Sequence, residues 1–297
     1  MDMKKAQLRT RLVPRFAALG MLTVGLLVGA AAAPASALAP VEARQATGSL
    51  SPASDLLNPA GDYVAIGDSF TAGQGAPPYT PGPCLRSRFA SYPALVSVLS
   101  PYRLVANRAC TAATVEDVRG QLAGLSPATR ASTHLVTLTV GGIDAGSNDI
   151  LAACAPDIAA PICNETIQAS TERLAVLGPQ LADLYSTVAA SLPAARVVVM
   201  NYPLMFEPGL LPLGDQFNAS TALLNAVIQG AVAATGNPRI TLTDVTQEFA
   251  GHGIGSPVPY IAFDPARPTA PPNFHPNALG NSLGYARALA NDGVLHR

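Results

Sequence analysis

Short apolar runs alternate with segments of helical spacing along most of this 297-residue chain. Runs suited to buried strands occupy residues 63–66, 103–106, 134–140, 196–200 and 239–242. Apolar residues recur at helical spacing over residues 92–99, 115–122, 167–192, 221–234 and 276–291. Strands that alternate with helices favour a parallel sheet covered on both faces. We therefore predict an α/β fold: a three-layer α/β/α sandwich around a central, mainly parallel sheet of about five strands.

The beginning of the chain does not share this pattern. Residues 1–37 combine a basic head, an apolar stretch and the small-residue sequence Ala35-Ser36-Ala37, which together are typical of a secretory signal peptide. A membrane anchor is the alternative, but the apolar stretch is short for a membrane span. Residues 38–60 are rich in Ala, Pro and Ser and indicate a flexible leader or short pro-segment. We expect one folded domain over residues 61–297, in a secreted, extracellular protein.

The charge of the chain argues against a nucleic-acid partner. Cleavage after Ala37 removes five of the 18 basic residues and one of the 19 acidic residues, which leaves a net charge of −5. A mildly acidic protein without a basic run is a poor nucleic-acid binder. Because 49% of the residues are hydrophobic and 12% are charged, the chain can bury a sizeable core. We expect it to be a monomer.

The four cysteines all follow the predicted signal peptide. An oxidising compartment favours two disulfides, for which three pairings are possible. We favour Cys84–Cys110 and Cys154–Cys163, because each pair closes a local loop. A zinc site is the competing interpretation, and neither a C-x-x-C pair nor a nearby histidine supports it.

Three consecutive predicted strands end in polar or glycine-rich segments. Ser69 follows the first strand, residues 110–114 follow the second, and residues 141–148 follow the third. Functional groups gather where parallel strands end at their carboxyl edge. A serine at this edge becomes a nucleophile if a base lies beside it, and His275 is the candidate base. Asp68 is expected to shape the turn through side-chain hydrogen bonds.

The segments around the serine and the histidine resemble those of a known family. Gly67-Asp68-Ser69-Phe70 looks like the first sequence block of the GDSL, or SGNH, hydrolases. His275-Pro276-Asn277-Ala278-Leu279-Gly280 is similar to the terminal H-P-x-x-x-G block, and Phe249-Ala250-Gly251-His252-Gly253 resembles a segment of secreted bacterial lipases and phospholipases. The resemblance covers the chain from about Tyr63 to its C-terminus. It implies a flavodoxin-like sandwich and a serine nucleophile.

The two middle blocks of the family differ here. Ala112 stands where the second block has a glycine whose N–H joins the oxyanion hole, and a backbone donor survives this change if the dihedral angles permit. The third block, usually Gly-Gly-Asn-Asp, reads Gly141-Gly142-Ile143-Asp144, so its side-chain donor is absent. Asn148 lies a few residues further on. The predicted oxyanion hole therefore comprises the N–H groups of Ser69 and Ala112 and the side chain of Asn148.

The catalytic acid of the family is also absent. Many members carry an aspartate three residues before the histidine, where this chain has Pro272. We expect a Ser69–His275 dyad in which a backbone carbonyl near Pro272 accepts the imidazole Nδ1–H and fixes the tautomer. With His275 as the base, activity should rise with pH through an apparent pKa near ~6.5. Alternatively, a carboxylate from elsewhere in the fold orients the imidazole, with three candidates: Asp144, Asp149 and Asp264.

These features predict a serine carboxylic-ester hydrolase that acts on lipid esters, as a lipase, phospholipase or lysophospholipase. The apolar segments at residues 76–79 and 208–213 would form an acyl-binding surface if they lie near the sheet edge, with transient contact to a lipid surface. A carbohydrate O-acetyl esterase or an acyltransferase on the same fold is an alternative, although aromatic residues make up only 5% of the chain. A catalytically inactive binding protein is another, because of Ile143 and Pro272. The serine mechanism needs no cofactor, and the sequence contains no metal-ligand cluster.

Overall fold

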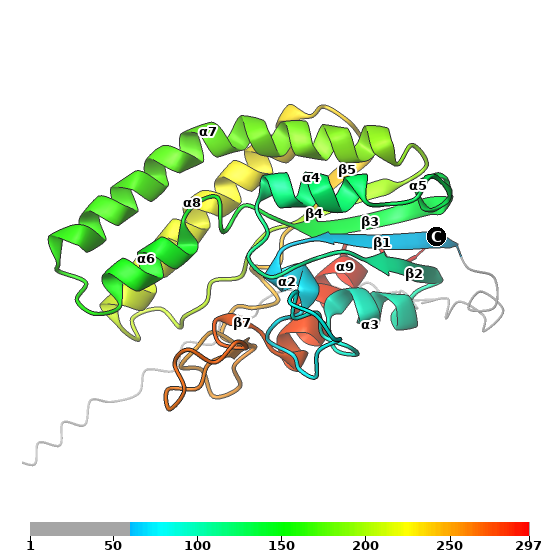
Figure 1. Ribbon diagram of the computed structural model, residues 1–297. Coiled ribbons are helices and arrows are strands. Elements are labelled where there is room, and N and C mark those ends of the chain that lie inside the picture. Colours follow the sequence, from blue (N-terminus) through cyan, green and yellow to red (C-terminus); the bar gives the residue numbers. More distant parts are fainter. Residues whose placement is uncertain (1–59, 297) are drawn as a thin grey trace, which may run out of the picture. The chain divides into compact units, whose positions relative to one another are not determined.

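Five parallel strands form one sheet in the computed structural model, which describes residues 60–296 (Figure 1). The strands are β1 (Gly61–Gly67), β2 (Tyr102–Asn107), β3 (Thr133–Thr139), β4 (Arg196–Met200) and β5 (Ile240–Thr243). Their order across the sheet is β2-β1-β3-β4-β5, and all neighbouring pairs are parallel. The predicted α/β fold is therefore confirmed. The predicted signal peptide and nearly all of the predicted leader lie outside the described residues.

Helices cover both faces of this sheet (Figure 1). One face carries α4 (Val115–Ala123), α5 (Pro127–Ser132), α7 (Pro161–Ser191) and α8 (Pro212–Ala234). The other face carries α3 (Tyr92–Leu99), the π-helix η1 (Gly280–Ala286) and α9 (Arg287–Asn291). The interior strands β1, β3 and β4 are therefore largely buried, which explains the apolar runs at residues 63–66 and 197–200.

The helix α8 begins at Pro212, whereas the sequence pattern placed its start at residue 221. Proline is favoured at the first position of a helix, because its missing N–H has no helical partner there. The first turns of α8 carry polar residues that weaken the apolar pattern. One of them, Asn218, is buried because its side chain hydrogen-bonds the backbone N–H and carbonyl of Phe206. The helical spacing of apolar residues therefore does not reveal that Asn218 faces the interior.

The closing helix also differs from the prediction. The predicted helix began at residue 276, but Pro276 belongs to β7 (His275–Pro276), which pairs antiparallel with β6 (Ile261–Ala262). The helical backbone starts at Ala278 and continues as the π-helix η1 and then as α9. A Cβ on Gly284 would lie 2.2 Å from the ring of Phe249, so this close packing requires a glycine.

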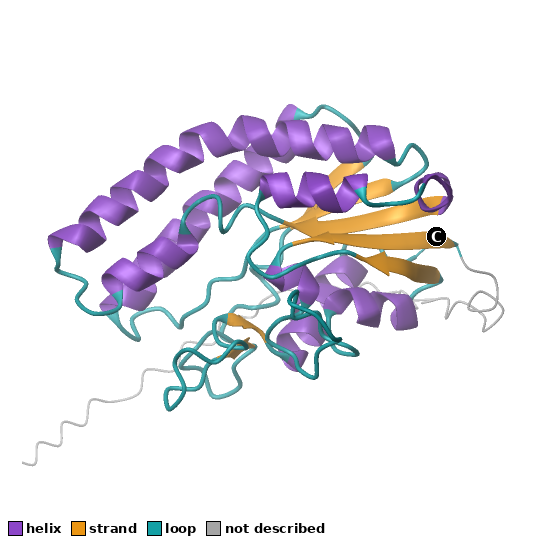
Figure 2. Ribbon diagram, in the orientation of Figure 1, coloured by secondary structure: helices purple, strands orange, loops and turns teal. Residues whose placement is uncertain are grey.

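Several loops gather at the carboxyl edge of the sheet (Figure 2). The short helix α2 (Ser69–Ala72) follows β1 at this edge. The loop after α2 and the loop around β7 lie beside it, coloured cyan and orange in Figure 1. Both disulfides are present, Cys84–Cys110 between the loop after α2 and the end of β2, and Cys154–Cys163 between α6 (Ser147–Cys154) and α7.

Candidate active site

Ser69 is the first residue of α2, and Asp68 caps this helix. One carboxylate oxygen of Asp68 accepts the Phe70 N–H at 3.0 Å and the Thr139 hydroxyl at 2.6 Å, and the other accepts the hydroxyl of Tyr202. Asp68 is only 2% exposed, and this burial raises its pKa to about 6. Asp68 thus shapes the turn that presents Ser69, as the sequence suggested.

The Ser69 hydroxyl is hydrogen-bonded to His275, although 206 residues separate the two in sequence. Ser69 Oγ lies 2.8 Å from His275 Nε2. His275 Nδ1 lies 2.7 Å from the carbonyl oxygen of Asn273. A carbonyl can only accept a hydrogen bond, so Nδ1 carries the proton and Nε2 is free to accept the proton of Ser69. The orienting group is therefore a backbone carbonyl, one residue beyond Pro272.

None of the three candidate carboxylates contacts the imidazole. Asp144 accepts the N–H of Val115 at the start of α4. The other two form ion pairs with arginines, Asp149 with Arg173 at 2.7 Å and Asp264 with Arg267 at 2.8 Å. The interpretation that a distant aspartate completes the site is therefore not supported.

Burial of the imidazole changes the expected pH dependence. Desolvation lowers the pKa of His275 to about 4, and the hydrogen bond to the Asn273 carbonyl opposes this shift only in part. The sequence-based value near ~6.5 assumed an unperturbed imidazole. Among residues 60–296, no carboxylate is paired with the ring to stabilise its charged form, so the neutral form of His275 persists to lower pH.

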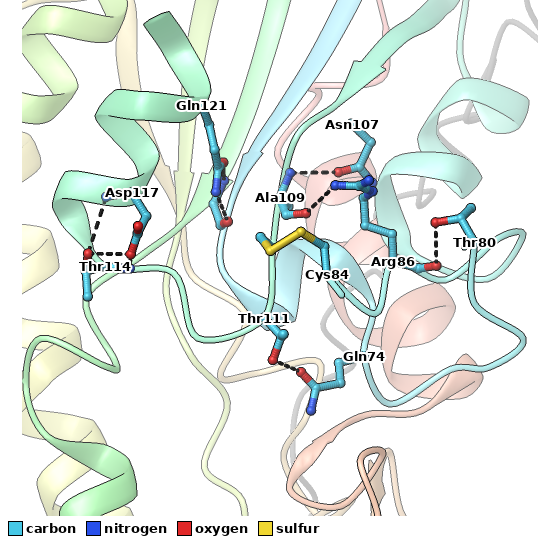
Figure 3. The surroundings of a disulfide bond; sticks show 12 residues. Gln74, Thr80, Cys84, Arg86, Asn107, Ala109, Thr111, Thr114, Asp117 and Gln121 are labelled. Atoms are coloured by element: carbon cyan, nitrogen blue, oxygen red, sulfur yellow. Dashed lines mark hydrogen bonds between the residues drawn. A yellow bond between two sulfur atoms is a disulfide. The ribbon is translucent and has the colours of Figure 1, made fainter. Parts of the chain in front are cut away.

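Two neighbouring residues fix the distance between the serine turn and the histidine strand. A Cβ on Gly75 would lie 2.3 Å from the carbonyl oxygen of Pro276, so only glycine allows this approach. Gln74 is 8% exposed; its side chain donates to the carbonyl of Pro271 at 2.7 Å and accepts the hydroxyl of Thr111 (Figure 3). Gln74 thus connects the loops that follow α2 and β2 with the loop that precedes His275. Sequence reasoning did not identify either role.

A cavity of about 290 Å³ opens beside the serine–histidine pair. Its walls include Leu151, Met205 and Phe217, which are apolar. Met205 and Phe217 also line a smaller, mostly apolar cavity of about 50 Å³. The segments at residues 76–79 and 208–213 line neither cavity, so they are not part of this apolar wall. The apolar wall comes instead from α6, α8 and the loop after β4.

The three predicted oxyanion donors come together at this cavity. Ser69, Ala112 and Asn148 all line it, as does Ile143. Ala112 has a φ of 56°, in the left-handed region that a glycine adopts without strain. Within residues 60–296, the backbone N–H groups of Ser69 and Ala112 and the side chain of Asn148 have no hydrogen-bond partner. They are therefore free to donate to a bound group.

The remaining candidate sites do not point to other chemistry. His134 Nδ1 is hydrogen-bonded to the carbonyl of Ser132, and His252 Nδ1 to that of Val258. His252 also stacks on Tyr260 at 3.8 Å between ring centres, which indicates a structural role. Within the described part of the chain, no three His, Cys, Asp or Glu side chains form a group that could hold a metal ion.

A serine and a histidine joined by a hydrogen bond at the carboxyl edge of a parallel sheet are the arrangement found in serine ester hydrolases. Comparison with known proteins agrees: residues 65–283 match the model of the GDSL-like Lipase/Acylhydrolase family, to which this chain belongs. The protein is therefore a hydrolase of the lipase and esterase type.

Relatives of known structure cover nearly the whole described domain. A lipase of Streptomyces rimosus is 33% identical over 239 residues, which are 77% of this chain and 85% of the relative. The crystal structure of the extracellular lipase from Streptomyces rimosus aligns with a TM-score of 0.69 and 32% identity, over 78% of this chain and 99% of that one. Phospholipase A1 from Streptomyces albidoflavus NA297 aligns with a TM-score of 0.69 and 31% identity, over 78% and 98%.

Proposed function

We propose that the protein is a secreted lipid-ester hydrolase in which Ser69 is the nucleophile and His275 the general base. The observation that carries the proposal is the 2.8 Å separation between Ser69 Oγ and His275 Nε2, at the wall of a partly apolar cavity. Bases within hydrogen-bond reach of a serine hydroxyl activate it for attack on an acyl carbon. The relatives named as lipases and as a phospholipase A1 favour a lipid ester as substrate.

In the proposed reaction, His275 Nε2 takes the proton of Ser69 while Oγ attacks the ester carbonyl carbon. The oxyanion then receives hydrogen bonds from the N–H groups of Ser69 and Ala112 and from the side chain of Asn148. His275 returns the proton to the departing alcohol, which leaves an acyl group on Ser69. A water molecule, deprotonated by His275, hydrolyses this acyl-enzyme. The Asn273 carbonyl holds the imidazole in position throughout, with less charge stabilisation than a carboxylate gives.

The cavity supports an acyl chain as the group next to the serine. Leu151, Met205 and Phe217 give it an apolar wall, and the smaller apolar cavity extends it. Transfer of a chain from water to such a wall is favourable by about 0.8 kcal/mol per methylene group. Secretion is supported by the two disulfides and by the extracellular relative, and the monomeric state stays a prediction.

The test compares the purified protein with Ser69→Ala and His275→Ala on short- and long-chain p-nitrophenyl esters, a phosphatidylcholine and an acetylated xylan. We expect hydrolysis of the long acyl esters or the phospholipid, reduced at least about 10⁴-fold in both variants. His252→Ala is the matched control and should keep full activity, because His252 lies outside the cavity. Activity on acetylated xylan alone would indicate a carbohydrate ester as the substrate class. Activity that survives Ser69→Ala would refute the mechanism.

The role of Asn148 has its own test. Loss of an oxyanion donor costs about 10²–10³ in kcat, so Asn148→Ala should lower kcat by this factor and leave KM nearly unchanged. Asn164→Ala removes an exposed amide from α7, away from the cavity, and should have no effect. An unchanged kcat for Asn148→Ala would remove this residue from the oxyanion hole.

A further inference from the structure

A groove of about 530 Å³ adjoins the active-site cavity on the far side of residues 111–112. The helix α4, with Asp117 and Gln121, forms one wall, and the Cys84–Cys110 disulfide lies on the other (Figure 3). Thr111 and Ala112 line both the groove and the active-site cavity. A ligand held in the groove would therefore be separated from Ser69 only by this short segment.

Two arginines line the groove, and the disulfide holds their segments together. Arg86 follows Cys84 by two residues, and Arg108 precedes Cys110 by two. Arg108 is exposed and makes neither an ion pair nor a side-chain hydrogen bond with another residue between 60 and 296. Arg86 donates one hydrogen bond, from Nη1 to the carbonyl of Ala109 at 3.2 Å, which leaves most of its N–H groups free.

The charge of the groove is positive. Asp117 is the carboxylate that lines it, and hydrogen bonds from Thr114 lower the pKa of Asp117, so it is ionised at neutral pH. Two guanidinium groups and one carboxylate leave a surplus of one positive charge. Four other arginines of the described chain are paired with carboxylates, for example Arg119 with Asp183 and Arg173 with Asp149. Unpaired guanidinium groups beside a substrate cavity are suited to an anion, and their planar fork matches phosphate geometry.

The groove and the smaller apolar cavity of about 50 Å³, here called the apolar extension, adjoin different parts of the active-site cavity. The apolar extension shares Met205, Phe217 and neighbouring residues with the cavity, whereas the groove shares Thr111 and Ala112. An ester bound at Ser69 has two sides, the acyl chain and the alcohol. With the acyl chain against the apolar wall, the alcohol side can extend towards the groove. In a phospholipid, the alcohol side carries a phosphodiester a few bonds from the ester.

We propose that Arg86 and Arg108 bind the phosphodiester of a phospholipid whose acyl ester lies at Ser69. This inference rests on the proposed function and specifies its substrate: the enzyme prefers phospholipids to neutral glycerides. Arg108 supplies a free guanidinium, and Arg86 supplies the N–H groups that Ala109 does not use. The Cys84–Cys110 disulfide holds together the two segments that carry these arginines, close to Ala112.

The test compares the wild type and Arg108→Gln on two soluble esters. Dihexanoylphosphatidylcholine, kept below its micelle-forming concentration, carries the phosphate, and dihexanoylglycerol does not. We expect kcat/KM for the phospholipid to fall about tenfold, mainly through KM, because a charge-assisted hydrogen bond is lost. Hydrolysis of dihexanoylglycerol should be unchanged. Arg287→Gln removes an exposed arginine from α9, outside the groove, and should behave as the wild type on both esters.

The outcomes separate this proposal from the proposed function. Equal losses on both esters, or no loss on the phospholipid, overturn the phosphate site. If the wild type hydrolyses neither ester, the proposed function fails, and calorimetric titration of Ser69→Ala with dihexanoylphosphatidylcholine tests the groove directly. Binding that weakens about tenfold on adding Arg108→Gln supports the groove, and unchanged binding overturns it. Arg108-dependent binding of inorganic phosphate alone would make the groove a free-anion site and also overturn the proposal.

Discussion

The substitution Gly75→Ala is a direct test of how the serine turn and the histidine strand are held together. An added Cβ would lie 2.3 Å from the carbonyl oxygen of Pro276 and 2.5 Å from that of His275. Ordinary contacts begin at 3.4 Å, so the two segments must separate by about 1 Å. Both obstructing atoms belong to the backbone of β7 and cannot rotate away.

This displacement acts on the reacting pair itself. A shift of about 1 Å would lengthen the 2.8 Å contact between Ser69 Oγ and His275 Nε2 beyond hydrogen-bond range. Misplacement by this amount costs about 10² in rate. Overpacking of a well-packed site also costs about 1–3 kcal/mol of stability. We therefore expect kcat to fall about 10²-fold, with a smaller change in KM because the apolar wall is untouched.

The assay is steady-state hydrolysis of p-nitrophenyl butyrate at 25 °C, with circular dichroism and urea unfolding to establish that the variant is folded. Gly230→Ala is the matched control, because Gly230 is exposed in α8 with nothing within 4 Å of an added Cβ. It should keep full activity and gain stability, by about 1 kcal/mol. A folded Gly75→Ala protein with the kcat of the wild type would refute the steric argument.

Three further predictions concern the same site. Because only neutral His275 accepts a proton and burial lowers its pKa to about 4, activity should be lost only as pH falls through about 4. At pH 5, kcat/KM should retain about 90% of its plateau value, against about 3% if the pKa of His275 were 6.5. A fall in kcat/KM near pH 6 that disappears in Asp68→Asn would instead reflect the titration of Asp68. Gln74→Leu removes both loop contacts and should lower kcat about tenfold at constant KM, and an unchanged kcat would contradict its positioning role. Replacing Cys84 and Cys110 by serine should lower the free energy of unfolding by roughly 3.5 kcal/mol in urea titrations, and no loss would contradict the loop-entropy estimate.

The sheet was predictable mainly because its interior strands β1, β3 and β4 are buried. Such strands carry continuous apolar runs, and the five predicted strands match β1 to β5 within two residues at each end. The helix boundaries were predicted less well where a tertiary contact places a polar residue on the buried face of a helix. In α8, Asn218 faces inward to satisfy the backbone of Phe206, so the apolar pattern starts later than the helix.

The site residues that act through their own side chains were predictable from the sequence. Ser69 and His275 are recognisable by their sequence context, and the structure places them in contact. The carbonyl of Asn273 could be anticipated only to within a residue, because backbone groups leave no mark on the sequence. Gln74 and Gly75 escaped notice because their roles depend on segments about 200 residues further along the chain.

The long separation between Ser69 and His275 has a consequence for when the enzyme becomes active. The nucleophile belongs to the first strand–helix turn of the domain, while the base lies on β7, close to the end of the described chain. A ribosome completes the serine turn 206 residues before it adds the base. A partly made or unfolded chain therefore cannot attack an ester. The ester-hydrolysing site forms only when the folded domain brings the serine turn and β7 together, so lipids of the producing cell are not exposed to it before folding.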